Sequence, residues 1–288
     1  MPGLPADLLK AYRARTFRTL PGMRLKERQD AIAYANQRGF IYFWPIKGIT
    51  LPSLWGAVAG DRPVADAHDD PGHVSWGWKD SLLGERQWYY AKILRKKATI
   101  ISLPVVPYFY ALSENYGAYD EDYLTLYEQG RLTLEAKTLY ETLLDKGPLD
   151  TVALRKAAHM SSPESESRFE RSLADLQANF MILPIAVTQA GAWRYAFAYE
   201  LTARYYPELV DEAHDISERS ARAHLVKLYL HSVGATQLRD LVRLFGWSPT
   251  QADAAVNDLV LQGQLSRGLE LENQPGEWIA VKHLLPVP

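Results

Sequence analysis

The sequence contains no cysteine. That absence excludes a disulfide scaffold, a thiolate zinc site and a cysteine nucleophile. The chain also lacks any run of about 18 consecutive apolar residues, the length that a membrane-spanning helix needs. Its N-terminus has no apolar stretch after the charged residues, so no secretory signal is expected. Together these absences favour a cytoplasmic protein that has no membrane partner.

Net charge is also small, −2 at pH 7 over 288 residues, but its distribution is uneven. Residues 1–100 carry 16 Lys and Arg against 9 Asp and Glu, whereas the remaining residues carry 16 against 25. Such a split can mark a polyanion-binding region in one half, and a chance spread of surface charge is the alternative. The acidic second half of the chain is a possible binding region for a protein partner.

A recognisable order of elements lies between residues 133 and 199. The spacing predicts a helix that begins at Thr133 and ends at Gly147, a short helix over 151–159 and a third helix after Ser162-Pro163. Two apolar stretches separated by a glycine-containing turn then predict two strands. Three helices followed by a two-stranded ribbon is the order of a winged helix, a helix-turn-helix with an appended β-hairpin.

The same order returns near the C-terminus. Helices are expected over 217–233 and 236–245, and a third one opens at Ser248-Pro249, again with serine before proline. Strands are expected over 266–271 and 278–281. The two copies share few residues, so the repeat rests on the order of elements and on the Ser-Pro positions.

The first hundred residues predict a further copy with insertions. Helices are expected before residue 20 and over 25–37, and Phe40–Trp44 predicts a buried strand. The fold class is therefore mainly α with small β-ribbons (α+β), arranged as tandem winged helices. We expect three domains over residues 1–115, 116–203 and 204–288.

In a winged helix the third helix usually enters the major groove of DNA. Here the two clear third helices begin SSPESESRFER and SPTQADAAVND. Arg168 and Arg171 stand among three glutamates in the first, and the second has no basic residue in that stretch. Because phosphate contacts supply much of the affinity for DNA, these acidic helices favour a framework role over base reading.

Two groups of basic residues lie earlier and are the better candidates for DNA contact. The first group occupies the first two predicted helices and the turn between them: Arg13, Arg15, Arg18, Arg24, Lys26 and Arg28. The second lies on a predicted hairpin: Lys92, Arg95, Lys96 and Lys97. With Lys79, Arg168 and Arg171 they form the predicted DNA-binding set.

The basic hairpin follows Trp88, Tyr89 and Tyr90. Basic and aromatic side chains together suit phosphate contact plus base stacking. The alternative is a solvated basic turn whose neighbouring aromatic residues belong to the core. The residues alone leave both interpretations open.

The segment HDDPGH, residues 68–73, holds two histidines and two aspartates. Such residues can ligate zinc or another divalent ion, but Asp-Pro-Gly is first of all a turn, and we expect neither a metal nor a cofactor here. The sequence also lacks a glycine-rich phosphate loop and a G-x-S-x-G elbow. If the protein excises bases, Asp69, Asp70 and Asp80 are the carboxylates in this region that could activate water or stabilise a cationic sugar.

Several motifs resemble a family of bacterial winged-helix proteins related to the glycosylases YcaQ and AlkZ. They are Trp78-Lys79-Asp80, the run SLPVVPYFYALSENYG, GPLDTVALRK and the Leu-Gln string that follows it, and the resemblance extends over most of the chain. The resemblance implies tandem winged helices around a DNA channel, double-stranded DNA as the partner and excision of bulky or crosslinked alkylated bases as the activity.

One departure from that family concerns its catalytic motif. YcaQ and AlkZ carry Gln-x-Gln or Gln-x-Asp just after a glycine in the first winged helix. The matching stretch here is Gly39 to Trp44, which places Tyr42 and Trp44 where the two polar residues belong. Neither can act as a carboxylate, and tryptophan offers one donor and no acceptor.

The resulting hypothesis is a DNA-binding winged-helix protein of the YcaQ and AlkZ type without the standard glycosylase motif. Two alternatives stay open. One is an active DNA glycosylase for alkylated or crosslinked bases with an altered catalytic set, and the other is a protein-interaction scaffold built from winged helices.

Overall fold

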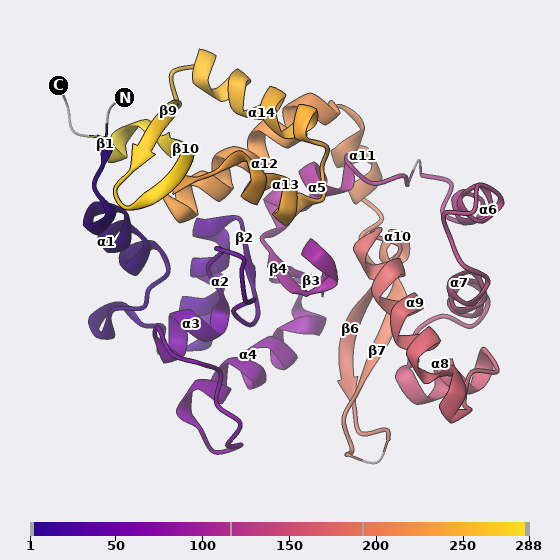
Figure 1. Cartoon of the computed structure of the whole chain (residues 1–288). Coiled ribbons are helices and arrows are strands. Elements are labelled where there is room, and N and C mark those ends of the chain that lie inside the picture. Colours follow the sequence, from indigo (N-terminus) through magenta and orange to yellow (C-terminus); the bar gives the residue numbers. More distant parts are fainter. Residues whose placement is uncertain (1–2, 116, 192, 286–288) are drawn as a thin grey trace.

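The computed structural model describes residues 3–115, 117–191 and 193–285. Its helices and strands form three modules in which the elements follow in the same order, coloured along the chain from indigo to yellow in Figure 1. Each module consists of a helix, a strand, two further helices and two further strands. This is the order expected of a winged helix.

The bounds of these elements are as follows. The first module contains α2 (Arg28–Arg38), β2 (Phe40–Tyr42), α3 (Leu54–Ala59), α4 (Val74–Leu82), β3 (Tyr89–Lys92) and β4 (Ala98–Ile101). The second contains α7 (Leu134–Lys146), β5 (Leu149–Asp150), α8 (Thr151–Ala157), α9 (Glu166–Ala178), β6 (Ile182–Thr188) and β7 (Ala196–Leu201). The third contains α12 (Glu218–Val233), β8 (Ala235–Thr236), α13 (Leu238–Phe245), α14 (Pro249–Leu261), β9 (Leu265–Leu271) and β10 (Gln274–Val281).

Shorter elements precede and connect the modules. The remaining strand and helices are β1 (Gly3–Leu4), α1 (Ala6–Thr16), α5 (Val106–Tyr110), α6 (Asp122–Glu128), α10 (Thr202–Tyr205) and α11 (Leu209–His214). The 3₁₀ turns are η1 (Pro21–Met23), η2 (Pro71–His73), η3 (Leu83–Glu85), η4 (Leu94–Lys96), η5 (Leu103–Val105), η6 (Pro163–Ser165) and η7 (Lys282–Leu284).

Each module closes its small sheet in the same way. The strand orders are β2-β4-β3, β5-β7-β6 and β8-β10-β9, so in every case the last strand lies between the first and the second. The third sheet gains β1, which pairs in parallel with β9. The start of the chain is therefore held against the last module, and Figure 1 shows both ends of the chain on that side.

The two Ser-Pro helix starts differ in the structure. Ser248 caps α14 with its side chain at the helix start that the sequence predicts, and it forms a capping box with Gln251. Ser162 makes no cap, because its hydroxyl bonds the carboxylate of Glu164. A 3₁₀ turn follows it, and α9 begins only at Glu166.

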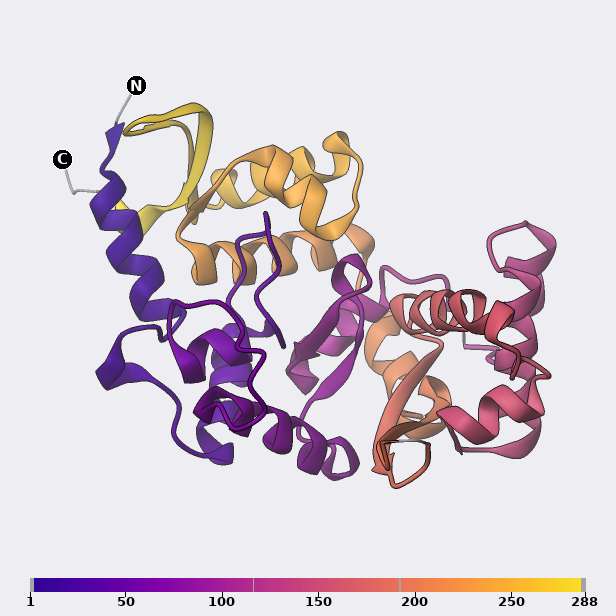
Figure 2. The same ribbon diagram turned by 60° about the horizontal axis from the view of Figure 1, so that its bottom comes forward.

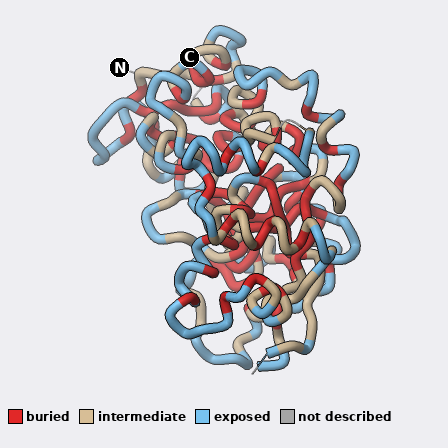
Figure 3. Tube along the Cα trace, turned by 90° about the vertical axis from the view of Figure 1, so that its right-hand side faces the viewer, coloured by how far each residue is buried: buried red, intermediate tan, exposed pale blue. Residues whose placement is uncertain are grey.

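Three hydrophobic clusters hold the modules together. One lies within the second module, and one lies within the first. The largest combines residues of the first module, such as Phe40 and Tyr42, with residues of α12, such as Leu225 and Tyr229. Figure 3 shows this buried interior as a continuous red region.

The first and third modules therefore share a core, and the second packs beside them. Figures 1 and 2 show the second module, drawn in pink and salmon, to one side of α1 and the third module. A mainly helical fold with small β-ribbons is confirmed. The three domain boundaries stay a prediction. Within the described ranges, no helix has the length and apolar composition that crossing a membrane requires.

Buried tyrosines make the fold sensitive to alkali. Burial raises the pKa of Tyr110 and of Tyr229 to about 12, and raises the pKa of Tyr89 further. An unfolded tyrosine ionises near pH 10, so the native state keeps protons that the unfolded state has lost. Stability should be unaffected below about pH 10 and should fall as the pH rises from there toward about 12.

Urea unfolding at a series of alkaline pH values, with tyrosinate absorbance recorded in parallel, checks this expectation. Most of the tyrosinate signal should appear together with the loss of helical circular dichroism. Ionisation of the buried tyrosines near pH 10 in a protein that keeps its fold would contradict it.

Candidate nucleic-acid interface

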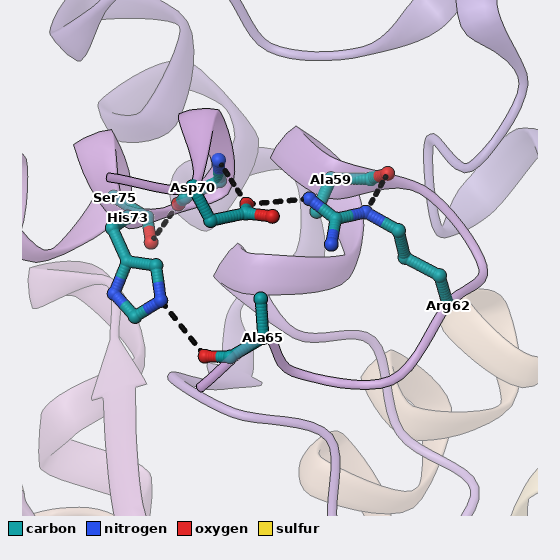
Figure 4. Close-up of polar contacts among 7 residues, drawn as sticks. Ala59, Arg62, Ala65, Asp70, His73 and Ser75 are labelled. Carbon is teal, nitrogen blue, oxygen red and sulfur yellow. Dashed lines mark hydrogen bonds and ion pairs between the residues drawn. The ribbon is translucent and has the colours of Figure 1, made fainter. Parts of the chain in front are cut away.

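The segment before α4 is held by contacts among its own polar groups. Asp70 caps the turn η2 by accepting from the Gly72 amide at 2.8 Å. Its carboxylate also accepts from Arg62 Nη2 at 2.6 Å, while Arg62 Nε donates to the Ala59 carbonyl at 3.3 Å (Figure 4). The Arg62 hydrogen bond, followed by the Gly72 amide, lowers the pKa of Asp70. Asp70 therefore stays ionised as a structural group.

His73 and Ser75 complete this arrangement. His73 Nε2 lies 2.9 Å from the Ala65 carbonyl, and Ser75 donates to the Gly72 carbonyl at 2.9 Å (Figure 4). Throughout the described part of the chain, no group of three or more His, Asp or Glu side chains is arranged to hold a metal ion. The HDDPGH segment therefore forms the turn that starts α4.

Lys79 on α4 lies in a closed aromatic site. Its side chain is 2% exposed, and Nζ contacts Asp80 Oδ1 at 2.6 Å and donates to the Tyr195 hydroxyl at 3.0 Å. Five aromatic rings lie within cation–π distance of Nζ, with centroids from 4.6 to 5.7 Å away: Phe43, Trp76, Tyr90, Tyr195 and Phe197. Burial lowers the pKa of Lys79, and the hydrogen bond and charge of Asp80 oppose that shift.

Tyr195 connects this site to the second module. Its hydroxyl donates to Asp80 Oδ1 at 2.9 Å and accepts from Trp76 Nε1 at 3.0 Å. Tyr195 and Phe197 belong to the β6–β7 hairpin, whereas the others come from α4 and the first sheet. Lys79 and Asp80 thus connect α4 of the first module to the β6–β7 hairpin of the second module.

The three candidate carboxylates do not form one site. Asp70 pairs with Arg62, and Asp80 pairs with Lys79 and Tyr195. Asp69 is exposed on the loop beside η2. Two of the three are therefore held by basic partners inside the protein, and Asp69 is the one that solvent reaches most freely.

The two residues that the resemblance places at the family's catalytic positions are both packed. Tyr42 is fully buried and donates its hydroxyl to the Leu94 carbonyl at 3.3 Å. The Trp44 ring packs at 4.5 Å from Phe43 and at 5.3 Å from Trp55, measured between ring centroids. Both side chains thus have partners within the first module.

The N-terminal basic residues have different surroundings. Arg13 donates to the Val233 and Ala235 carbonyls at 2.9 and 2.8 Å, which docks α1 on the third module. Arg28 pairs with Glu85 at 2.6 Å.

The remaining N-terminal basic residues have longer hydrogen bonds or exposed side chains. Arg18 reaches Gln37 at 3.4 Å, and Arg24 donates to the Thr19 carbonyl at 3.5 Å. Arg15 and Lys26 are exposed. This group therefore splits into structural and exposed members.

The basic hairpin faces α9 of the second module. Lys92 lies 3.6 Å from Glu170, and Lys96 pairs with Asp175. Arg95 and Lys97 remain exposed. Part of the charge that marked the hairpin as a phosphate contact is therefore neutralised by acidic residues of α9.

The aromatic residues before that turn belong to the core. Trp88, Tyr89 and Tyr90 are 2%, 0% and 8% exposed. Because these rings are buried, bases cannot stack on them. The alternative interpretation, in which the aromatic residues beside the basic turn belong to the core, is the one that the structure shows. On α9 itself, Arg168 lies 3.4 Å from Glu135, whereas Arg171 is exposed.

Sequence reasoning missed Tyr195 and the rings around Lys79. Lys79 was expected to contact DNA, but it is buried, and its partners include Tyr195 and Phe197 of the β6–β7 hairpin. Tyr195 lies 115 residues after Asp80, and no local pattern indicates that they meet. The available signal was the density of tryptophan and tyrosine around residue 79 and in the turn at residues 193–199.

The Lys79–Asp80 pair should contribute strongly to stability. Asp80→Asn leaves a buried ammonium without its carboxylate, and breaking such a pair costs about 3–5 kcal/mol. Lys79→Met keeps the apolar stem and removes the charge, so combining it with Asp80→Asn should recover most of the loss. Urea unfolding of the full chain measures both effects.

Asp69→Asn is the matched control. Because Asp69 is exposed, this substitution should change the free energy of unfolding by less than about 0.5 kcal/mol. Equal unfolding midpoints for Asp80→Asn and Asp69→Asn would show that the buried pair is not a stabilising contact.

Comparisons with known proteins bear on this arrangement. A family model described as "AlkZ related" matches residues 25–246. The solved structure of the Streptomyces sahachiroi DNA glycosylase AlkZ is similar, with a TM-score of 0.61 and 12% sequence identity, over 98% of this chain and 71% of that chain. At that identity the likeness concerns the fold. No curated protein matches this sequence.

Proposed function

Because the chain belongs to the AlkZ-related family, we propose that it binds double-stranded DNA without using the family's Gln-x-Gln or Gln-x-Asp chemistry. The observation that carries this proposal is the family match together with a fold similar to a DNA glycosylase over 98% of the chain. Three helix-turn-helix modules with appended hairpins suit DNA contact through helices, wings and phosphate-binding side chains.

The residues at the catalytic positions support binding without base excision. Tyr42 is buried, and its hydroxyl is occupied by the Leu94 carbonyl. The Trp44 indole packs among other rings and has no acceptor. A side chain that positions water beside a sugar needs an accessible acceptor or carboxylate, and neither residue supplies one.

The exposed basic residues are the proposed phosphate contacts. Among the residues that the structure describes, the members of the predicted set that have an exposed side chain and no acidic partner are Arg15, Lys26, Arg95, Lys97 and Arg171. Lys79 and Arg13 are assigned to structural roles instead, since one is buried and the other binds backbone carbonyls.

The wing of the second module offers an additional contact. Trp193 is 91% exposed beside Arg194, in the turn between β6 and β7. An aromatic ring and a guanidinium that project together suit stacking on a base and contact with a phosphate. The Tyr195 contact with α4 would hold this turn in place.

A glycosylase with an altered catalytic set is the second candidate, favoured by the DNA glycosylase with the similar fold. Asp69 would then be the first carboxylate to test, because Asp70 and Asp80 are engaged by Arg62 and Lys79. Release of alkylated bases from a lesion-bearing duplex, abolished by Asp69→Asn, would select this candidate.

DNA affinity measured across a salt series by fluorescence anisotropy tests the main proposal. The logarithm of the affinity should fall linearly with the logarithm of the salt concentration, with a slope of about −0.9 for each phosphate contacted. The charge reversals Arg95→Glu and Lys97→Glu should weaken binding at low salt and make the slope shallower.

No binding of the wild-type chain at low salt would end both DNA hypotheses. Binding that is indifferent to charge reversal at residues 95 and 97 would remove the hairpin from the interface. The protein-interaction scaffold would then become the candidate to pursue, through the acidic surface of the second half.

A further inference from the structure

A second basic surface lies where α1, α2, α12 and η7 meet, outside the predicted DNA-binding set except for Arg15. We call it the α12 patch and define it by Arg15, Arg38, Lys227, His231 and His283. They come from four elements that are far apart in the chain. The packing of α12 against the first module brings them together.

Contacts around the end of α12 hold this arrangement. Arg38 Nη1 and the Tyr12 hydroxyl donate to the His231 carbonyl at 3.2 and 2.9 Å. The His283 ring lies 5.9 Å from both the Tyr12 ring and the His231 ring, measured between centroids. Residues of α1 and α2 thus hydrogen-bond the backbone at His231, while the imidazole rings of His231 and His283 lie next to each other and are exposed.

The side chains that act electrostatically on this patch are basic. The pKa of His231 is lowered first by burial and then by the charges of His283, Lys227 and Arg38. Arg38 and Arg15 both lower the pKa of Tyr12, against the larger effect of burial. Like charges gathered in this way repel one another, so a bound anion would remove an unfavourable interaction.

The nearest cavity along α12 does not offset this charge. A cavity of about 400 Å³ is lined by His224, Lys227, Asp258 and other residues of α12 and α14. Its carboxylate, Asp258, is already paired with Arg219, whose hydrogen bond lowers the pKa of Asp258. Asp258 is therefore engaged by a basic residue other than Lys227.

We propose that the α12 patch binds adjacent phosphates of the DNA backbone. This inference rests on the proposed function and adds a location for phosphate contact in the third module. DNA suits the patch because it carries one charge for every ~1.7 Å of helix axis, so basic groups on neighbouring elements can each meet a phosphate. Arginine, lysine and imidazolium side chains are all N–H donors to phosphate oxygens.

Such a site has a pH dependence whose sign is defined. His231 is surrounded by Arg38 from α2, Tyr12 from α1, His283 from η7 and Lys227 on its own helix, and Arg15 of α1 acts on Tyr12. In the free protein these surroundings favour the neutral imidazole, and a bound phosphate favours the charged one. Binding therefore takes up protons, and affinity should rise as the pH is lowered from about 8 toward about 6.

Lys227→Gln and the pair His231→Gln with His283→Gln test the patch in the full-length chain, with a labelled duplex and the salt series above. Lys227→Gln should weaken binding about tenfold and make the salt slope shallower by about 1. The histidine pair should remove the rise in affinity at low pH. The matched control is Lys146→Gln with Arg239→Gln, two exposed basic residues outside the patch.

The outcomes separate this inference from the function on which it rests. If the wild-type chain does not bind DNA, the proposed function fails and the patch has no DNA ligand. If the wild-type chain binds and the patch variants match the control in affinity, salt slope and pH dependence, the proposed function stands and the patch inference is overturned. Unfolding midpoints of each variant confirm that the fold is intact.

Discussion

The packing of α12, the first helix of the third module, against the first module is the constraint on which the rest of the structure depends. Leu225, Val226 and Leu230 are completely buried in a core that also contains Phe40 and Tyr42 of the first sheet. A helix that shares one apolar core with two modules prevents them from moving independently. It also sets the position of α1, whose Arg13 reaches the carbonyls that follow α12.

Apolar and polar contacts together place the second module, whose Phe180 and Leu183 pack into the same core. Its wing reaches α4 through Tyr195, which bonds Asp80 and Lys79 among five aromatic rings. Its third helix α9 supplies Glu170 and Asp175 to the basic turn of the first module. These acidic residues of α9 therefore contact a neighbouring module.

These internal pairings change what the charge asymmetry of the sequence means. Some of the basic residues among the first hundred form ion pairs with Glu85, Glu170 and Asp175. What remains for a polyanion is a smaller set of exposed basic groups, and the α12 patch adds to it residues from the half of the chain that is acidic overall. Net charge by segment therefore does not show which basic groups are free to contact a polyanion.

The sequence by itself determined the elements and the family. Local capping and periodicity predicted the strand at Phe40, the basic turn at residues 95–97 and the helix start at Ser248, because these depend on near neighbours. The relation to AlkZ read from motifs such as Trp78-Lys79-Asp80 is confirmed by the family match. The start of α9 was misplaced, because Ser162 bonds Glu164 in preference to the backbone.

Tertiary structure alone decided which of the basic residues are free. Lys79 and Lys97 look alike in the sequence, yet one is enclosed by residues more than 100 positions away and the other is exposed. The same holds for His231 and His283, which meet only because α12 and η7 pack side by side. Burial and pairing depend on contacts between distant segments, and no local pattern of residues carries that information.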